Sequence, residues 1–244
     1  MSLPEIATPD QWVAARKELL TREKELTHAR DQLSAVRRRL PMVPVEKDYR
    51  FQGPDGEVGL IDLFEGRSQL IIVHFMFDPE WEDGCPSCTA GADEMADGLL
   101  NHLHARDTTI AWVSRAPLAK LEDYKRRRGW TFPWYSSHGS DFNYDFHVTL
   151  DETVAPVEYN FRTADEHARR GLEMELVGEF PGRSSFLRDG DRVFHTYSVY
   201  ARGMEGIGGS YYLLEETALG RQEDWEEPKG RAASARGAIP DFAA

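Results

Sequence analysis

The residues best suited to chemistry are two cysteines, Cys85 and Cys88, which are separated by Pro86 and Ser87. They are the only two cysteines in a chain of 244 residues. Two thiols at this spacing can cycle between a dithiol and a disulfide, because the second lies about one helical turn from the first. In a reducing compartment, such a pair indicates redox or metal chemistry more than a structural disulfide.

The segments on either side of this motif suggest how it is positioned. Residues 70–77 form an apolar run rich in β-branched and aromatic side chains, typical of a strand buried on both faces of a sheet. An acidic connection follows, and residues 89–100 are predicted to form a helix. The first cysteine would then lie where free helix N–H groups and the helix dipole favour a thiolate. Proline at the next position suits a first helical turn.

Composition narrows the class of protein. Hydrophobic residues make up 41% of the chain, enough for a substantial core, and the net charge of −13 argues against nucleic-acid or anionic-membrane partners. No apolar stretch reaches the ~18 residues that a membrane span needs. The first ten residues lack the basic and apolar regions of a signal peptide. We therefore predict a cytoplasmic protein with no cofactor.

Three regions are predicted along the chain: a helical arm at residues 1–42, a central domain at 43–220 and a polar tail at 221–244. A capping box at Thr8 begins a helix that Pro41 ends. Its apolar residues recur every seven positions: Trp12, Leu19, Leu26, Leu33 and Leu40, with Ala15, Arg22, Ala29 and Val36 three positions after the first four. The helix either lies on its own domain or forms a homodimer as a coiled coil.

The central domain alternates strands and helices. A hairpin is predicted around the turn at 53–56, then the apolar strand, the motif helix, a strand at 108–114, a helix at 117–129 and a strand at 130–136. Residues 137–178 are predicted to be an insertion, and a hairpin around Asp189 and Gly190 follows, with strands at 185–188 and 191–200. This order indicates an α/β fold with parallel strands and right-handed crossovers.

Two segments carry a family resemblance. HFMFDPEWEDGCPSC (residues 74–88) and VFHTYSVYARG (residues 193–203), together with the N-terminal helix, resemble the bacterial DUF899 family, which is thioredoxin-like and related to the AhpC/TSA–thioredoxin superfamily. The resemblance implies a three-layer sandwich preceded by a β-hairpin. It also implies that Cys85 attacks a substrate disulfide and that Cys88 resolves the product, with a protein or small-molecule thiol or disulfide as the partner.

The same resemblance assigns roles to neighbouring residues. His74 aligns with the buried acid that moves the proton of the resolving thiol in thioredoxins, and imidazole can do this near neutral pH. The alternative is a core histidine bonded to a backbone carbonyl. Pro86 and Ser87 lie on the expected substrate side, and Trp81 lies there too, either over the motif or on a partner surface, unless it packs in the core.

The sequence departs from related patterns at several positions. Pro-Ser between the cysteines resembles glutaredoxins more than thioredoxins, and implies a more oxidising couple. Thioredoxins have a cis-proline directly before the strand that would correspond to 185–188, and Pro181 lies too early for that position. Peroxiredoxins have a proline and a hydroxyl residue before their reactive cysteine, but here Pro79 is one residue off and Glu82 replaces the hydroxyl.

The sequence does not decide how the charges of the loop before Cys85 affect its thiolate form. Four carboxylates crowd it, Asp78, Glu80, Glu82 and Asp83, and they would oppose a thiolate unless they point into solvent.

Two other classes of function remain open. The cysteines could bind copper or zinc with a histidine, for which His74, His102, His104 and His195 are candidates, although the spacing matches no zinc-finger pattern. A non-catalytic binding protein could instead use the polar aromatic residues His138, Tyr144, His147, His195, Tyr197 and Tyr200. Strand alternation would place His195, Tyr197 and Val199 on one face of the last strand.

Overall fold

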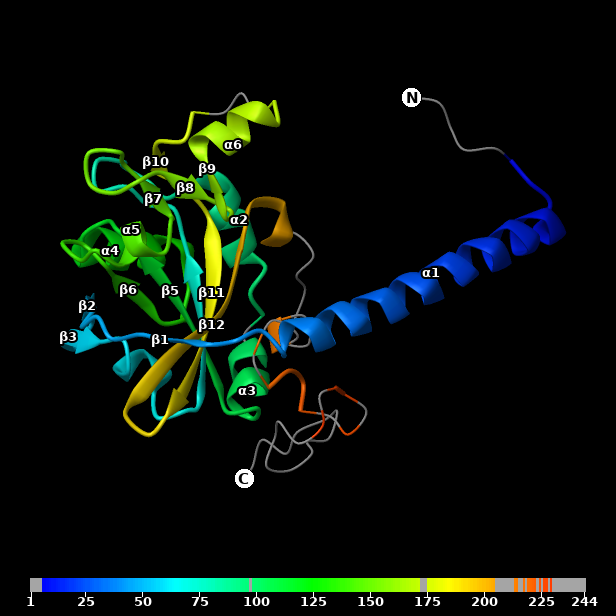
Figure 1. The fold of residues 1–244 in the computed structure, drawn as a ribbon, viewed down its shortest axis with the longest axis horizontal. Coiled ribbons are helices and arrows are strands. Elements are labelled where there is room, and N and C mark those ends of the chain that lie inside the picture. The colour runs from blue at the N-terminus through cyan, green and yellow to red at the C-terminus, as the bar shows by residue number, and fades with distance from the viewer. Residues whose placement is uncertain are drawn as a thin grey trace.

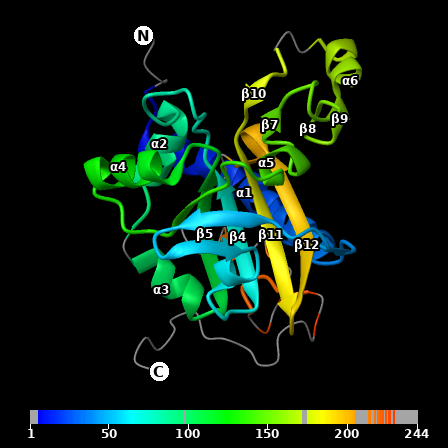
Figure 2. The same ribbon diagram turned by 90° about the vertical axis from the view of Figure 1, so that its left-hand side faces the viewer.

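A computed structural model describes residues 6–96, 98–171, 175–204, 213–214, 217, 219–222, 224, 226–227 and 229. Its main sheet has eight strands in the order β1-β12-β11-β4-β5-β6-β2-β3. Their bounds are β1 Val43–Pro44, β2 Arg50–Gly53, β3 Gly56–Gly59, β4 Gln69–His74, β5 Thr108–Ser114, β6 Trp134–Ser136, β11 Gly182–Asp189 and β12 Arg192–Tyr200. Strands β5, β4, β11 and β12 lie side by side at its centre (Figure 2).

The pairing of these strands defines the fold. β4 pairs in parallel with β5, and β5 pairs in parallel with β6, while β11 is antiparallel to both β4 and β12. The chain passes from β4 to β5 through α2 (Pro86–Asp93) and α3 (Gly98–His104), and from β5 to β6 through α4 (Leu118–Arg128). A strand that leads into a helix, a parallel neighbour and a final antiparallel hairpin form the thioredoxin-like α/β fold, as predicted.

Two separate cores cover the two faces of the sheet. On one, which we call the helix face, side chains of α2, α3 and α4 pack on Ile71, Phe75 and Trp134. On the other, which we call the insertion face, Leu70 and Ile72 contact residues from the hairpin, from the 3-10 helix Asp62–Phe64 and from α5 (Phe142–Asp145). Because side chains alternate along a strand, successive residues of β4 serve different cores.

Short elements complete the region between β6 and β11. They are β7 Thr149–Leu150 paired with β10 Gly178–Glu179, β8 Glu158–Tyr159 paired with β9 Arg162–Thr163, and α6 Ala164–Arg169. A 3-10 helix, Ala201–Met204, follows β12. The predicted insertion at 137–178 therefore supplies part of the cover of the insertion face through Phe142, Phe146 and Val148.

The N-terminal helix α1, Pro9–Arg37, projects away from the domain (Figure 1). The predicted capping box is present, since the Thr8 hydroxyl accepts from the Gln11 N–H and the Gln11 side chain accepts from the Thr8 N–H. Of the helix residues only Ser34 is buried. The prediction that this helix lies on its own domain is therefore wrong, and the coiled coil remains a prediction.

Several boundaries differ from those predicted. The motif helix at 89–100 is two helices, because α2 ends at Asp93, whose carboxylate accepts from the Trp130 indole N–H at 2.9 Å. The strand at 70–77 ends as β4 at His74, yet Phe75 and Phe77 stay buried by packing on Trp134. Strand β11 begins three residues earlier than expected, at Gly182.

The predicted hairpins are present. β2 and β3 pair across the turn Pro54–Asp55, where Gly56 has a φ of 121° that favours glycine. β11 and β12 pair up to Asp189 and Arg192. No helix in the described ranges is both long enough and apolar enough to cross a membrane.

Candidate functional site

The loop after β4 brings the cysteine motif to the start of α2. The Cys85 N–H donates to the Met76 carbonyl at 3.0 Å, which fixes the loop at its last residue. Cys85 is the N-cap of α2, and its carbonyl accepts from the Thr89 N–H at 2.9 Å to close the first helical turn. Pro86 is the first helical residue, where its missing N–H costs no hydrogen bond. The predicted order of strand, loop, Cys-x-x-Cys and helix is confirmed.

Close packing below the motif requires a glycine next to the first cysteine. A Cβ on Gly84 would lie 2.5 Å from Cε1 of Phe75 and 3.4 Å from Cε1 of Tyr124. The Tyr124 hydroxyl is in turn 2.8 Å from the Thr89 hydroxyl of α2. The helix start therefore rests on an aromatic platform, and Gly84 lets Cys85 approach it.

The two thiols are free and occupy different environments. Cys85 Sγ lies 3.1 Å from Ser87 Oγ, and Cys88 is the more deeply placed of the pair. The hydrogen bond from the Cys88 thiol lowers the pKa of Cys85 to about 5, with help from the Ser87 hydroxyl and from backbone N–H groups, against the opposing effect of burial. The same contact, together with burial, raises the pKa of Cys88. This difference favours the thiolate form of Cys85 and the protonated form of Cys88 near neutral pH.

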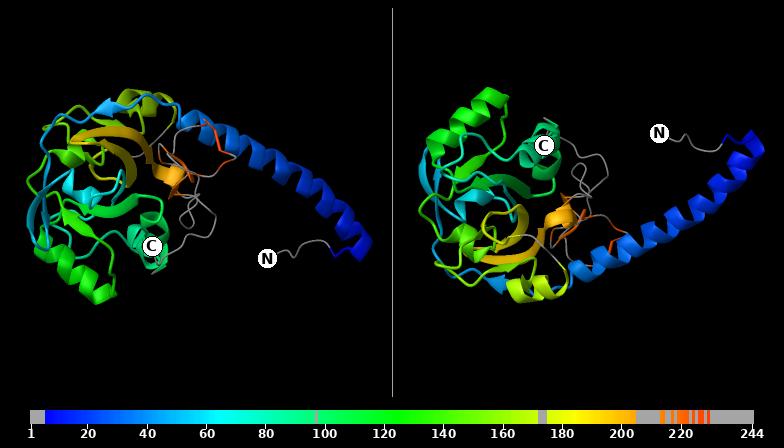
Figure 3. Two further views of the ribbon diagram at one scale, coloured as in Figure 1. Left: turned by 90° about the horizontal axis from the view of Figure 1, so that it is seen from below. Right: turned by 90° about the horizontal axis from the view of Figure 1, so that it is seen from above.

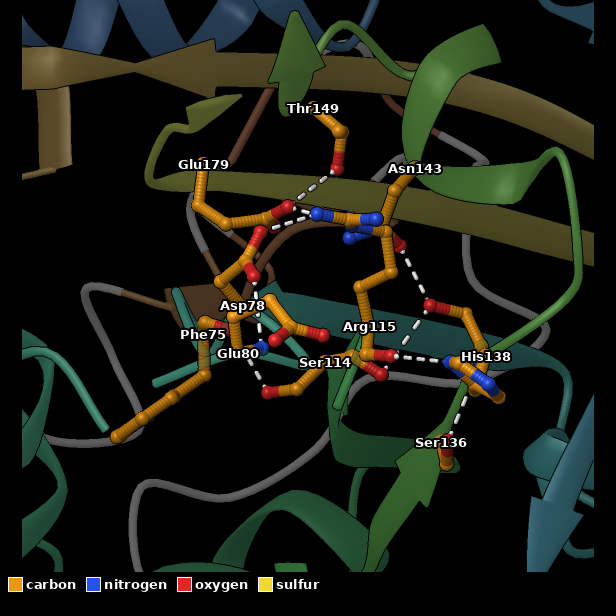
Figure 4. A network of polar contacts seen from close by, with 11 residues as sticks. Phe75, Asp78, Glu80, Ser114, Arg115, Ser136, His138, Asn143, Thr149 and Glu179 are labelled. Atoms are coloured by element: carbon orange, nitrogen blue, oxygen red, sulfur yellow. Dashed lines mark hydrogen bonds and ion pairs between the residues drawn. The ribbon is translucent and has the colours of Figure 1, made fainter. Parts of the chain in front are cut away.

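Basic residues from outside the motif neutralise part of the acidic approach. Arg115 pairs with Asp78 and donates through Nε to Glu179 at 2.7 Å (Figure 4). The buried Glu179 also accepts from Thr149 Oγ1 at 3.0 Å, and burial raises its pKa while Arg115 opposes that shift. This network connects the loop after β4 to the insertion.

Helix α4 holds the rest of that loop. Lys120 Nζ donates to the carbonyls of Pro79 and Trp81, each at 2.6 Å, and Arg127 pairs with Asp83 at 2.6 Å. Local sequence patterns do not identify Arg115, Lys120 and Arg127 as partners of the motif loop. A signal was present, since a basic helix follows an acidic loop, but the sequence does not show that they face each other.

A cleft of about 880 Å³ opens beside Cys88 on the helix face. Its lining is mostly apolar and includes Trp112, Leu99 and Met95, with the buried Arg183 in its wall. Of the predicted substrate-side residues, Ser87 lines the cleft, whereas Trp81 and Pro86 are exposed outside its described lining.

The cleft also corrects the interpretation of Pro181. Because β11 begins at Gly182, Pro181 lies directly before this strand and lines the cleft together with Cys88. It therefore occupies the position directly before the strand, and the prediction that Pro181 lies too early for this position is wrong.

The structure places the His74 ring in the insertion-face core, although His74 also borders the cleft that Cys88 lines. The ring lies on the insertion face between Phe142 and Phe146, with centroid distances of 5.6 Å and 6.0 Å. Its Nε2 is 2.8 Å from Ser184 Oγ, and burial together with His195 lowers the pKa to about 3. The prediction that His74 moves the proton of Cys88 obtains no support from the ring contacts, which lie on the insertion face. His74 is a core histidine, bonded to a serine hydroxyl.

A β-bulge changes the predicted arrangement of the last strand. The register between β11 and β12 shifts between Ser185 and Phe186, which leaves Thr196 as the extra residue. His195 Nε2 is consequently 2.7 Å from Ser198 Oγ, which is 2.8 Å from Ser184 Oγ. Simple alternation, which placed His195 with Tyr197 and Val199, fails here, and His195 joins the buried chain of polar groups that starts at His74.

The alternative sites obtain little geometric support. Within the described residues, no group of three or more His, Cys, Asp or Glu side chains could hold a metal ion. His102 and His74 both border the cleft, but the rings of His74 and His195 pack against Phe146 on the insertion face. The proposed set of polar aromatics is divided too: Tyr200 donates to the Phe146 carbonyl at 3.0 Å, while His138 contacts the Arg115 carbonyl at 3.3 Å.

The strand order and the free cysteine pair at the start of α2 define a thioredoxin-like protein with a Cys-x-x-Cys site. The chain belongs to the family described as "Bacterial protein of unknown function (DUF899)", which matches residues 1–236. No curated protein matches the chain.

Similar solved structures belong to redox proteins. A mutant of Peroxiredoxin Q from Xanthomonas campestris is 14% identical, with a TM-score of 0.42 over 66% of this chain and 87% of that chain. Peroxidoxin BcpB from Mycobacterium tuberculosis is 15% identical, with a TM-score of 0.43 over 67% and 86%. A secreted M. tuberculosis disulfide oxidoreductase homologous to E. coli DsbE is 13% identical, with a TM-score of 0.30 over 63% and 87%.

Proposed function

We propose that the protein is a dithiol–disulfide oxidoreductase in which Cys85 is the nucleophile and Cys88 is the resolving thiol. One observation carries this proposal: two free thiols meet at the start of α2, and their mutual contact lowers the pKa of one while it raises the pKa of the other. A pKa of about 5 keeps Cys85 ionised at neutral pH, and the ionised form is the one that attacks.

The reaction proceeds in two exchanges. The Cys85 thiolate attacks one sulfur of a substrate disulfide, which forms a mixed disulfide and releases the other sulfur as a thiolate. Cys88 then loses its proton and attacks Cys85 Sγ, which forms the Cys85–Cys88 disulfide and releases the second product thiolate. The substrate gains two electrons and the protein loses two, so an external dithiol must reduce the pair before the next cycle. The released product thiolates are the bases that can accept the proton of Cys88.

The cleft beside Cys88 supports a small thiol or disulfide as the substrate. Its volume of about 880 Å³ lies in the ~300–1,000 Å³ range of small-molecule sites, and its lining is largely apolar. Ser87 and Pro181 bring polar and backbone groups to its edge near the sulfurs. A protein substrate is the other partner in this proposal, with Trp81 and Pro86 as its exposed contacts.

The proposal includes a cytoplasmic location and the three predicted regions, with the dithiol inside region 43–220. A reducing compartment suits a protein whose two cysteines are both in one reactive motif. The charge of −13 supports a partner other than a nucleic acid.

Titration in redox buffers tests the proposal. Purified protein is equilibrated in glutathione or dithiothreitol buffers over a range of potentials, quenched with an alkylating agent and weighed by mass spectrometry. We expect one two-electron transition between about −270 and −120 mV, the range of thioredoxin-fold oxidoreductases. Cys88→Ser should lose the intramolecular transition. A wild-type pair that stays reduced throughout the range would contradict the proposal and favour a binding protein.

A further inference from the structure

Helix α1 carries an apolar stripe that the described part of its own chain leaves open. The stripe, which we call the seam, consists of Trp12, Leu19, Leu26 and Leu33 at one heptad position and Ala15, Arg22, Ala29 and Val36 at the other. Trp12 is 61% exposed, Leu26 is 51% exposed and Leu33 is 58% exposed. Both views of Figure 3 show the helix extending from the domain as a free rod.

An exposed helix with an apolar stripe indicates a site for a binding partner. It has 29 residues and is therefore about 43 Å long, and most of its side chains are solvent-exposed. Helical stability in proteins comes mainly from tertiary packing of an apolar face, and large exposed apolar patches mark interaction sites. A strict seven-residue repeat is the pattern of a coiled coil rather than of a helix that covers a broad core.

The base of the helix is attached to the domain, so the rod has a defined direction. Arg38 Nη1, directly after α1, pairs with the buried Glu226 at 3.0 Å. The Arg37 guanidinium lies 4.8 Å from the centroid of the Tyr197 ring. The C-terminal end of α1 is thus anchored, and the seam points along the free part of the rod.

We propose that two copies of the chain pair through α1 in an antiparallel coiled coil. The residues argue for this orientation, because the seam alternates large and small side chains. In an antiparallel pair, large residues of one helix face small or flexible ones of the other. The resulting layers are Trp12 with the partner's Val36, Leu19 with the partner's Ala29, Leu26 with the partner's Arg22, and Leu33 with the partner's Ala15.

Parallel pairing fits these residues poorly. It would place Arg22 against the partner's Arg22 inside the seam, and it would leave Ala29 against the partner's Ala29 with a gap. In the antiparallel pair, the partner's Glu25 flanks Arg22 and neutralises it.

The antiparallel pair has two-fold symmetry, because both copies contribute the same residues to the interface. Such an interface is closed and cannot extend into a filament. The two domains lie at opposite ends of the rod, and each dithiol works without the other. The inference is therefore independent of the proposed dithiol reaction.

Light scattering of the full-length chain tests the pairing. We expect a mass twice the 27.8 kDa of one chain for the wild type and for Leu20→Lys, because Leu20 is 40% exposed but lies outside the seam. Leu26→Lys places a second cation in the seam, so its mass should fall by half, with an unchanged circular dichroism melting curve for the domain. A monomeric wild type, or a Leu26→Lys variant that stays dimeric, would overturn the inference.

Cysteine cross-linking tests the orientation in a Cys85→Ser/Cys88→Ser background. Leu19→Cys and Ala29→Cys are prepared separately and then mixed with exchange of subunits. The antiparallel pair predicts a disulfide between the two variants in the mixture and none for Leu19→Cys or Ala29→Cys alone, because identical positions lie about 15 Å apart along the axis. Cross-linking of each variant with itself would show a parallel pair and overturn the inference.

Discussion

Polar side chains lie in different environments on the two faces of the central sheet. On the helix face, Cys88 lines a cleft and Cys85 is the N-cap of α2, and their contact separates their pKa values. On the insertion face, His74 and His195 are joined through two serine hydroxyls inside an aromatic core. The same strand, β4, leads into both arrangements, so the face to which a side chain points decides between chemistry and packing.

The buried chain on the insertion face has a consistent direction of donation. The Tyr197 carbonyl contacts His195 and raises its pKa, although burial has the larger and opposite effect. With Nδ1 of His195 donating to that carbonyl, Nε2 accepts from Ser198, Ser198 accepts from Ser184, and Ser184 accepts from His74 Nε2. His74 stays neutral, since its pKa is lowered to about 3. The chain ends at His74 Nδ1, which is buried and has no hydrogen-bond partner among the described residues.

The largest expected effect separates the two thiols of the helix face. Cys85→Ser should react with an aromatic disulfide reagent at least ~30-fold more slowly than Cys88→Ser near neutral pH. Cys85→Ser removes the contact with Cys85, but burial still raises the pKa of the remaining Cys88, so its thiolate fraction is below the roughly 3% of an ordinary thiol. Stopped-flow absorbance gives the rates, and mass spectrometry should show a stable mixed disulfide on Cys88→Ser. Equal rates for the two variants would remove the distinction between nucleophile and resolving thiol.

The second prediction concerns the insertion face, where burial of His74 should make the free energy of unfolding depend on pH. Unfolded His74 binds a proton below a pH of about 6.5, whereas the buried residue binds one only near 3, so the unfolded state binds more protons between these values. The free energy of unfolding should therefore fall by about 1.4 kcal/mol per pH unit for this group as the pH drops through that window. Urea unfolding at several pH values should show a shallower dependence for His74→Gln.

The same variant tests the separation of the faces. The alkylation profile of Cys85 in His74→Gln should match that of the wild type, because the His74 ring contacts Ser184, Phe142 and Phe146 on the insertion face. A shifted profile would restore His74 as a partner of the dithiol.

A pair of glycine variants compares the packing on the helix face with open surface. Gly84→Ala should lower the free energy of unfolding by about 1–3 kcal/mol, because its Cβ would overlap Phe75. The matched control Gly91→Ala, also near the motif, meets nothing within 4 Å and should stabilise α2 by about 0.5–1 kcal/mol. Chemical denaturation measures both. Two variants of equal stability would argue against the aromatic platform below Cys85.

The smallest expected effect concerns two serines, one on each face. Ser87→Ala should raise the pKa of Cys85 by less than about one unit, because the hydroxyl is a secondary contribution to the lowered value. Ser198→Ala removes a hydroxyl from the buried chain and should leave that pKa unchanged. The pH dependence of alkylation measures both variants, and a shift in Ser198→Ala alone would reverse the assignment of the faces.

The sequence predicted the part of the site that depends on local order. The apolar run, the acidic connection and Cys85 before a helix follow from local patterns, and so does the capping box at Thr8. The face to which His74 points could also be predicted from the sequence. Residues two apart along a strand share a face, so His74 lies on the same face as Leu70 and Ile72.

Other features depend on contacts between distant segments. Arg115 meets Glu179 across 64 residues of sequence, and nothing local to either residue indicates the pair. The bulge opposite Ser185 and Phe186 changes the faces of β12, and its residues have no glycine or proline to mark it. The early start of β11, which places Pro181 at the cleft, likewise follows from pairing with β4 and not from local propensity.

The pH dependence of Cys85 alkylation in the wild-type protein tests the central claim most directly. Iodoacetamide labelling is followed residue by residue with mass spectrometry from acidic to alkaline pH. The account predicts a midpoint at a pH of about 5 for Cys85, with Cys88 unlabelled until far more alkaline conditions. A midpoint for Cys85 near the ordinary thiol value of about 8.5 would contradict it.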